Sequence, residues 1–206
     1  MLLYDHPISS NALKVRFLLA ELGLRYERRT VELVRPRDAA YVARNPLGTV
    51  PLLLDGDFSL AESHAILKYL ADREGRDDLY PTDLHERASV DELLDRWATV
   101  LRPAFFAVER LALGYAPEAG FGGAPRDPAG AAEAEARVAP QVQIAEQLVG
   151  GATAVLGRFT IADIAMAPVL FRTTKTGMSL APYPKLAALR DAVTSRTAWA
   201  AAEPVT

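Results

Sequence analysis

The apolar positions of the first 75 residues predict short strands interleaved with helices. An apolar run at residues 2–4 ends at Asp5-His6-Pro7, which indicates a strand followed by a loop. From Asn11 onward the apolar residues recur at the i, i+3, i+4, i+7 spacing of an amphipathic helix, at Val15, Leu18, Leu19 and Leu22. A helix over residues 11–22 follows, because serines suited to an N-cap precede it and Gly23 suits its end.

The next stretch predicts three more strands and two more helices. Asp55-Gly56-Asp57 is typical of a hairpin turn, because glycine and aspartate favour the backbone angles that such a turn needs. The expected strands are 26–32, 50–54 and 58–60, and the expected helices are 38–44 and 62–73. The order is β-α-β followed by α-β-β-α, which is the thioredoxin arrangement, here without a Cys-x-x-Cys motif.

Beyond residue 75 the strand signals nearly disappear. The pattern predicts a long helical stretch with a possible kink at Pro103, then a loop rich in glycine, proline and alanine, then further helices. The expected helical segments are 84–113, 131–149, 160–172 and one or two within 183–202, and the loop is 114–130. The chain therefore divides into a thioredoxin-like α/β domain at residues 1–75, a linker at 76–84 and an all-α domain at 85–206.

One helix start can be predicted in detail. Thr160-Ile161-Ala162-Asp163 forms a capping box, in which the threonine accepts from a backbone amide and the aspartate reaches back to the cap amide. Phe159 and Ile164 occupy the two positions of a hydrophobic staple. We assign this motif a structural role worth about 1–2 kcal/mol and no chemistry.

The composition narrows the classes of function. Half of the 206 residues are hydrophobic and the net charge is −3, so neither a nucleic acid nor an anionic membrane surface is an expected partner. The absence of cysteine excludes disulfides, thiolate metal sites and cysteine nucleophiles. Three scattered histidines, His6, His64 and His85, do not suggest a metal site. No signal peptide and no membrane-spanning run is visible, so a cytoplasmic location is expected.

Val50-Pro51 stands out because a proline interrupts an apolar strand. Proline cannot donate a ladder hydrogen bond, and a Val-Pro peptide can adopt the cis form cheaply. A turn of the chain here can leave the backbone N–H and C=O of Val50 free to pair with an extended peptide.

Two predicted helix starts carry side chains suited to a charged ligand. Ser9, Ser10 and Asn11 lie at the start of the first helix, whose free N–H groups and partial positive charge favour an anion such as a thiolate. Glu62-Ser63 begins another helix, where the serine suits a carboxylate and the glutamate an ammonium group. Each serine can also serve simply as a helix cap. Together with the Val50 edge, these groups fit glutathione, an extended tripeptide with a γ-glutamyl end and a central cysteine.

At this point the chain resembles the cytosolic glutathione transferase family over almost its full length. The resemblance is carried by Asn45-Pro46-Leu47-Gly48-Thr49-Val50-Pro51, by Glu62-Ser63-His64-Ala65-Ile66 and by Phe159–Asp163. It implies a thioredoxin-like domain followed by a helical domain, glutathione as co-substrate without a metal, and a homodimer. The segment beginning at Ser9 is similar to the serine-type subgroup, in which the first serine activates the thiol.

The resemblance also implies roles for individual residues. Ser9 stabilises the glutathione thiolate with Asn11 assisting, and Arg37 contacts the glycyl carboxylate. Pro51 is the cis-proline, and the Val50 backbone holds the cysteinyl part beside Thr49, which stands where many members carry glutamine. Glu62 and Ser63 bind the γ-glutamyl end. From helix position alone, the second-substrate pocket is expected between the domains, with Trp97, Phe105, Phe106, Arg110 and the 114–130 loop contributing; the aromatic residues can equally be core.

Two other functions stay open at this stage. Ser9-Ser10-Asn11 also resembles the maleylacetoacetate isomerase pattern, although Asn11 replaces that subgroup's cysteine and Lys14 its arginine. A non-catalytic binding or regulatory protein with the same fold is the alternative from another class. Tyr4 invites comparison with the tyrosine-type subgroup, but its place within a strand predicts a packed residue.

Overall fold

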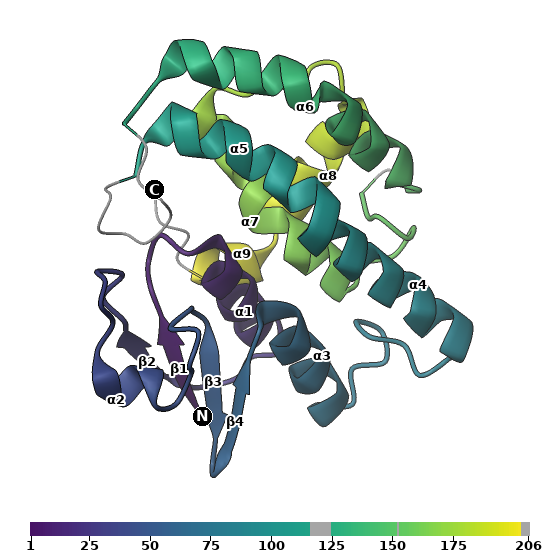
Figure 1. Cartoon of the computed structure of the whole chain (residues 1–206). Helices are drawn as coiled ribbons and strands as arrows, with labels where there is room; N and C mark the ends of the chain where they lie inside the picture. The colour runs from purple at the N-terminus through teal and green to yellow at the C-terminus, as the bar shows by residue number, and fades with distance from the viewer. Residues whose placement is uncertain (116–124, 152, 203–206) are drawn as a thin grey trace.

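The computed structural model describes residues 1–115, 125–151 and 153–202, and Figure 1 shows an α/β domain joined to a helical domain. The first domain contains one mixed sheet with the strand order β2-β1-β3-β4. β1 and β2 run parallel, whereas β3 is antiparallel to both β1 and β4. Its elements are β1 Leu2–Asp5, α1 Ser10–Glu21, β2 Glu27–Thr30, α2 Ala39–Val42, β3 Leu52–Asp55, β4 Phe58–Ala61 and α3 Ser63–Arg73.

The two faces of the sheet are covered by different helices. Successive side chains of a strand point to opposite faces, and this alternation is visible on β1 and β3. Leu3 and Leu53 are fully buried in the main core with residues of α1 and α3. Tyr4 and Leu52 point the other way and pack with Tyr41 of α2. The packed position expected for Tyr4 is confirmed, since only 8% of this residue is exposed.

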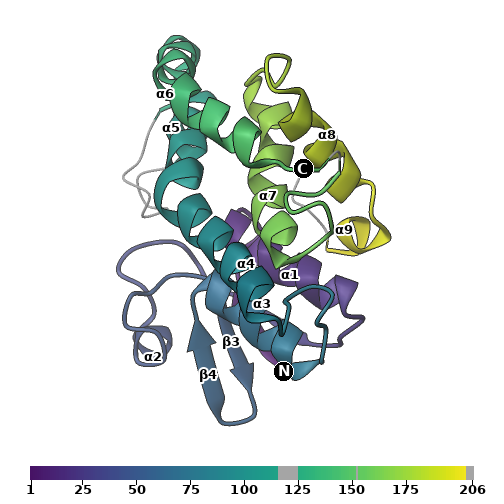
Figure 2. The same ribbon diagram turned by 90° about the vertical axis from the view of Figure 1, so that its right-hand side faces the viewer.

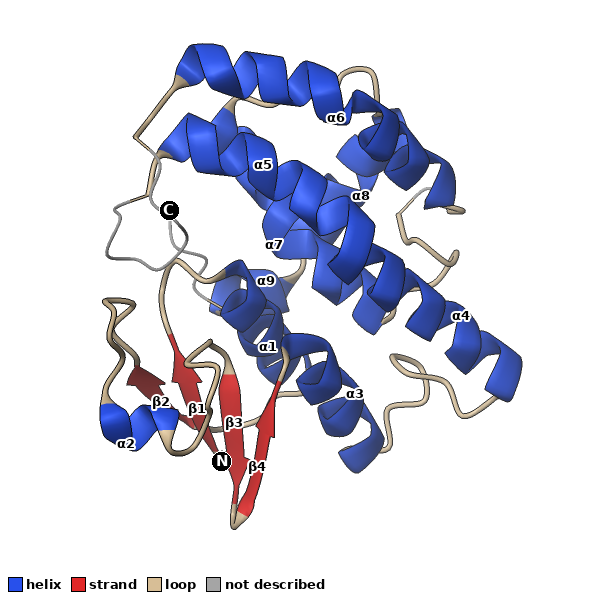
Figure 3. Ribbon diagram, viewed as in Figure 1, coloured by secondary structure: helices blue, strands red, loops and turns tan. Residues whose placement is uncertain are grey.

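The second domain is entirely helical within the described residues (Figure 3). A π-helical turn at Trp97–Leu101 connects its first two helices directly before Pro103, which cannot donate a backbone hydrogen bond. The expected irregularity near Pro103 is therefore present as a π-turn. The helices are α4 Leu84–Arg96, α5 Arg102–Leu113, α6 Pro128–Leu148, α7 Ile161–Thr176, α8 Pro184–Thr194 and α9 Thr197–Ala201.

Helix α1 joins the two domains into one core. It packs against α3 on its own side and against α7 and α9 of the helical domain (Figure 2). The ring of Phe17 on α1 lies 5.3 Å from that of Trp199 on α9, centroid to centroid, in an edge-on contact. Arg16 of the same helix donates to the backbone oxygen of Ala202 over 3.0 Å and pairs with Asp5 over 2.6 Å. The middle of α1 is thus held from both domains.

The capping box at the start of α7 is confirmed, and it includes one hydrogen bond that the motif does not predict. Asp163 accepts from the backbone N–H of Thr160 over 2.7 Å, and Thr160 accepts from that of Ala162 over 3.3 Å. The other oxygen of Asp163 accepts from the backbone N–H of Val155 over 2.7 Å. This buried carboxylate therefore joins the helix start to the loop that precedes it.

Most expected elements are present, with boundaries that differ by a few residues. The strands are shorter than expected, because β2 covers only Glu27–Thr30 and β3 begins at Leu52, past the proline. The Arg35-Pro36 bond is cis, which the sequence analysis did not anticipate. Residues 116–124 of the expected loop lie outside the described part of the chain. Among the described helices, none is long and apolar enough to span a membrane.

Candidate active site

Ser9 lies where β1 gives way to α1. It is the N-cap of α1, and its Oγ accepts from the backbone N–H of Ala12 over 3.2 Å. Its own N–H donates to the backbone oxygen of His6 over 2.9 Å, so the residue is fixed from two directions. A hydroxyl that accepts a hydrogen bond still has its hydrogen to donate. Ser9 therefore serves as a helix cap and keeps a donor for a ligand at the same time.

The Val50-Pro51 bond is cis, as the sequence predicts. The loop before it is fixed through Thr49, whose backbone oxygen accepts from Asn45 over 2.7 Å and from the hydroxyl of Tyr41. Val50 precedes the first paired residue of β3 and makes no backbone–backbone hydrogen bond with any described residue. Its N–H and C=O are therefore available to an added peptide strand.

Glu62 has an unusual backbone conformation at the start of α3. Its φ is +69°, in the left-handed region that residues with a side chain rarely adopt, and such strain tends to occur at functional sites. The carboxylate is exposed and pairs with no described residue. Ser63 follows as the first residue of α3 and is buried. A small cavity of about 80 Å³ connects both residues with Asn11, Thr49, Val50 and Pro51.

Arg37 fastens the loop after β2 onto the loop before Pro51. Its Nε donates to the backbone oxygen of Gly48 over 3.0 Å, and its Nη1 donates to that of Val34 over 2.9 Å. Gly48 has a φ of +60°, and a Cβ there would lie 2.9 Å from the Cγ of Arg37. Glycine is therefore required on both counts. Burial, and then the neighbouring Arg35, lower the pKa of Arg37.

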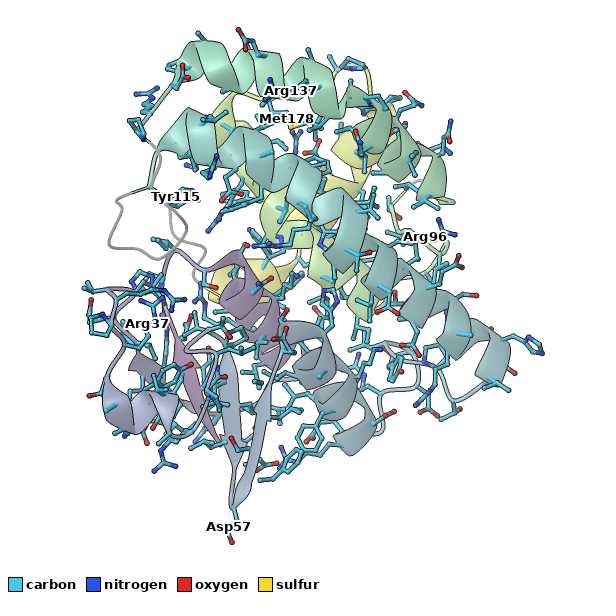
Figure 4. The ribbon with its side chains drawn as sticks, viewed as in Figure 1. Arg37, Asp57, Arg96, Tyr115, Arg137 and Met178 are labelled. Atoms are coloured by element: carbon cyan, nitrogen blue, oxygen red, sulfur yellow. The ribbon has the colours of Figure 1, made fainter. Side chains whose placement is uncertain are left out.

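A larger cavity of about 210 Å³ lies between the domains and adjoins the smaller one. The two share Asn11, Thr49 and Val50. In Figure 4, Arg37 of the first domain and Tyr115 at the end of α5 lie on the same side of the molecule. The cavity is lined by Ile8, Ser9, Ser10, Asn11, Leu33, Arg35, Arg37, Thr49, Val50, Arg102, Phe106, Tyr115 and Arg172.

The expected second-substrate residues are only partly in this cavity. Phe106 lines it, whereas Trp97 and Phe105 are buried in the core with ring centroids 5.7 Å apart. The alternative prediction, that the aromatic residues belong to the core, is therefore correct for Trp97 and Phe105. Arg110 does not line the cavity, so the expectation for this residue is wrong.

The helical domain contributes polar groups that no pattern in the sequence predicts. Glu109 is buried on α5 and accepts from Arg172 of α7 and from the hydroxyl of Tyr115. Arg172 also donates to the backbone oxygen of Ile8, and so holds the loop before Ser9. Burial, and then Glu109, raise the pKa of Tyr115. Pairs between residues so far apart leave no local pattern in the sequence. A single arginine in an apolar stretch, such as Arg102, is the one signal that could have indicated a functional residue here.

A lysine and a histidine lie together near the site, the lysine buried and the histidine partly buried. The Nζ of Lys14 on α1 is 3.1 Å from the Nε2 of His64 on α3. Burial lowers the pKa of Lys14 well below its usual value, with Arg102 adding to the effect and Glu62 opposing it. Burial, and then Lys14, lower the pKa of His64 from 6.5 to about 2. His64 is therefore neutral at pH 7 and can accept a hydrogen bond from Lys14.

This pair predicts acid-sensitive stability. The unfolded chain protonates His64 near pH 6.5, whereas the folded chain keeps it neutral to about pH 2, so lowering the pH favours the unfolded state. The free energy of unfolding should therefore fall by up to about 1.4 kcal/mol per pH unit below pH 6.5 on account of this residue. Urea denaturation of a His64→Gln variant, which keeps an acceptor for Lys14, should give a flatter profile.

The matched control for this pH effect is His85→Gln, which alters an exposed histidine at the start of α4. The free energy of unfolding of this variant should change with pH in parallel with that of the unaltered protein. Parallel profiles for the His64 variant and the unaltered protein would contradict the assignment.

A thioredoxin-like domain, a helical domain and a cavity at their junction define the two-domain fold of glutathione S-transferases. Family models agree with this geometry along both halves of the chain. "Glutathione S-transferase, N-terminal domain" matches residues 1–72, and "Glutathione S-transferase, C-terminal domain" matches residues 117–197. The chain therefore belongs to the glutathione S-transferase family.

Individual relatives extend over nearly the whole chain. Glutathione S-transferase F10 of Arabidopsis thaliana is 29% identical over 201 residues, which cover 94% of this chain and 92% of that one. The crystal structure of glutathione transferase F7 from Populus trichocarpa has a TM-score of 0.84 at 24% identity, covering 100% and 99% of the two chains, and it supports the fold. A holo structure titled maleyl pyruvate isomerase, a bacterial zeta-class member, has a TM-score of 0.78 at 25% identity, covering 99% and 97%.

Proposed function

We propose that the chain is a glutathione transferase that joins the thiolate of glutathione to an electrophilic, largely apolar substrate. The observation that carries the proposal is the pair of adjoining cavities. They bring together residues from four separate segments, which the sequence analysis had assigned to one peptide ligand. Membership of the family supports the same reaction.

Ser9 is the residue assigned to the chemistry. Its hydroxyl would donate to the sulfur of glutathione while it continues to cap α1, and the amino end of the helix would favour the negative charge. Lowering a thiol pKa from about 8.5 by one or two units requires about 1.4–2.7 kcal/mol. A charge-assisted hydrogen bond together with a helix end is of this size. Asn11 would assist Ser9, and the thiol proton leaves to solvent. The thiolate then attacks the electrophilic carbon of the second substrate and forms a C–S bond, while the displaced group leaves with the electron pair of the broken bond, as chloride does from 1-chloro-2,4-dinitrobenzene.

The remaining residues are assigned to holding glutathione. Val50 would pair its backbone with the cysteinyl part, supported by the fixed loop at Thr49 and Pro51. The carboxylate of Glu62, which pairs with no described residue, suits the γ-glutamyl ammonium group, and Ser63 at the start of α3 suits the γ-glutamyl carboxylate. Arg37 lies beside the same cavity, and its guanidinium already donates to backbone oxygens, so it would offer its remaining N–H groups to the glycyl carboxylate.

A glutathione-dependent cis–trans isomerase of the maleylacetoacetate type is the second candidate. Two observations favour it, namely the structural similarity to the zeta-class maleyl pyruvate isomerase and the arginines around the larger cavity. Asn11 at the position of that subgroup's cysteine speaks against it. A non-catalytic glutathione-binding protein is the remaining alternative.

Turnover with two substrates separates these functions. A transferase consumes glutathione when it reacts with 1-chloro-2,4-dinitrobenzene, whereas an isomerase converts a maleyl ketoacid without net consumption of glutathione. Conjugation should be the faster reaction relative to its uncatalysed rate. Faster isomerisation would favour the second candidate, and binding of glutathione without either reaction would favour the third.

We further infer a cytoplasmic homodimer acting in detoxification, as the family resemblance implies. In such a dimer the first domain of one subunit meets the helices of the other. Exposed apolar side chains are available on both domains, since Phe58 on β4 and Val100 in the π-turn are each 48% exposed. The molecular mass in solution, from light scattering, tests the dimer.

A further inference from the structure

The larger cavity is strongly cationic. Four arginines line it, Arg35 and Arg37 from the first domain and Arg102 and Arg172 from the second. Its described wall includes no aspartate or glutamate. Glutathione carries one carboxylate at its glycyl end, which is assigned to the side of Arg37. The arginines that the helical domain contributes are therefore not required to bind the glycyl carboxylate of glutathione.

Arg102 differs from the other arginines of this wall. Arg172 is paired with Glu109, Arg37 donates to backbone oxygens, and Arg35 is exposed to solvent. Arg102 makes no ion pair within the described residues. Its Nη2 donates to the Oγ of Ser10 over 3.2 Å, and its Nε is buried without an acceptor among them.

The partly buried charge of Arg102 favours an anion in the cavity. Removing a cation from water costs several kcal/mol, about as much as an opposite charge with good geometry returns. Burial is the main cause that lowers the pKa of Arg102; Glu109 opposes this, and Arg172 adds to it. Glu109 already accepts from Arg172 and Tyr115 and lines no part of the cavity. No described carboxylate pairs with Arg102, so an anionic ligand in the cavity can supply its counter-charge.

The surroundings of Arg102 indicate the shape of this ligand. Its guanidinium carbon lies 5.5 Å from the centre of the Phe106 ring, and the rings of Phe106 and Tyr115 are 6.0 Å apart, centroid to centroid. Aromatic faces of this kind suit a flat, unsaturated skeleton. Ser10, which receives the hydrogen bond from Arg102, is the direct neighbour of Ser9. A group bound to Arg102 would therefore lie close to the glutathione sulfur.

We infer that the second substrate is a carboxylate on an aromatic or unsaturated skeleton, and that Arg102 binds its carboxylate. This inference rests on the proposed function and adds the charge of the electrophile to it. Arg102 acts in specificity, while Ser9 acts on the thiol. The assignment explains why the second-substrate side of the cavity is basic in a chain whose net charge is −3.

Two stable conjugates test the inference without turnover. S-(4-carboxybenzyl)glutathione and S-(4-carbamoylbenzyl)glutathione differ in the charge of one group of similar size, and calorimetry gives the dissociation constant of each. The unaltered protein should bind the acid about 10-fold more tightly or better, as expected for a hydrogen bond to a charged group. Arg102→Gln should remove this preference, and Arg102→Lys should restore part of it.

The matched control is Arg96→Gln on α4 (Figure 4), where the arginine is exposed and, among the described residues, pairs only with Glu92. It should leave the preference unchanged. Equal affinities of the unaltered protein for acid and amide would overturn the inference, as would a preference that survives in Arg102→Gln. Both ligands share the glutathione part. If the unaltered protein prefers the acid but conjugates no electrophile, that result would count against the proposed function alone. Failure to bind either conjugate would remove both.

Discussion

Replacing Ser9 by alanine should lower kcat with 1-chloro-2,4-dinitrobenzene about 10- to 100-fold at pH 6.5. The reason is the loss of one hydroxyl donor to the sulfur, worth one to two units of thiol pKa, or about 1.4–2.7 kcal/mol. The acid limb of the pH–rate profile should move up by the same interval, and the loss should shrink near pH 9, where the thiol ionises unaided. Steady-state kinetics over this pH range measure both effects.

The Ser9→Ala variant loses a helix cap as well as a donor to the sulfur, because Ser9 also accepts a hydrogen bond from the backbone N–H of Ala12. The two effects must be measured separately. Loss of that cap costs about 1 kcal/mol of stability, which urea denaturation measures separately. Ser9→Thr keeps a hydroxyl and a cap and should retain a large part of the activity. Ser89→Ala is the matched control, since this serine on α4 is exposed and its hydroxyl donates to the backbone oxygen of His85. An unshifted pH profile in Ser9→Ala would exclude Ser9 from thiol activation and leave the family assignment intact.

Replacing Asp163 by alanine should cost about 3–5 kcal/mol of unfolding free energy. The backbone N–H groups of Val155 and Thr160 both donate to this carboxylate over 2.7 Å, and the site is buried. Each buried donor left without a partner costs about 1–3 kcal/mol, and the N-terminal cap of α7 is weakened as well. The value exceeds the 1–2 kcal/mol expected from the motif, because the motif does not reveal the bond to Val155.

An exposed cap offers the comparison for Asp163. Asp127 caps α6 by accepting from the backbone N–H of Gly130 over 2.9 Å, and the surrounding residues are exposed. Asp127→Ala should therefore cost only about 1 kcal/mol. Urea denaturation of the two variants side by side measures the difference. Equal losses would show that Asp163 acts as an ordinary cap.

Local patterns in the sequence predict much of the fold. The helical spacing of Val15, Leu18 and Leu19 predicts α1, and Asp55-Gly56-Asp57 predicts the turn between β3 and β4, both as observed. The cis bond before Pro51 follows from the chemistry of proline, and the capping box at Thr160 from its spacing. These features depend on neighbours within a few residues, which is why sequence alone is enough for them.

The helical side of the site could not be predicted in the same way. An apolar stripe shows that Trp97 and Phe105 lie on a helix, but it does not distinguish the core from a pocket wall, and here both are core. Arg172 reaches Ile8 across 164 positions of sequence, and Arg102 reaches Ser10 across 92. Contacts of this range depend on how the domains pack. The first domain's part of the cavity wall could therefore be predicted from motifs, and the second domain's part could not.

The central claim is that this site ionises the thiol of glutathione. Ultraviolet absorbance of the thiolate, recorded as a difference spectrum of the complex during a pH titration, measures the pKa of the bound thiol directly. We expect it to lie one to two units below the ordinary thiol value of about 8.5, and to return towards that value in Ser9→Ala. Glutathione that binds with an unchanged thiol pKa would contradict the account.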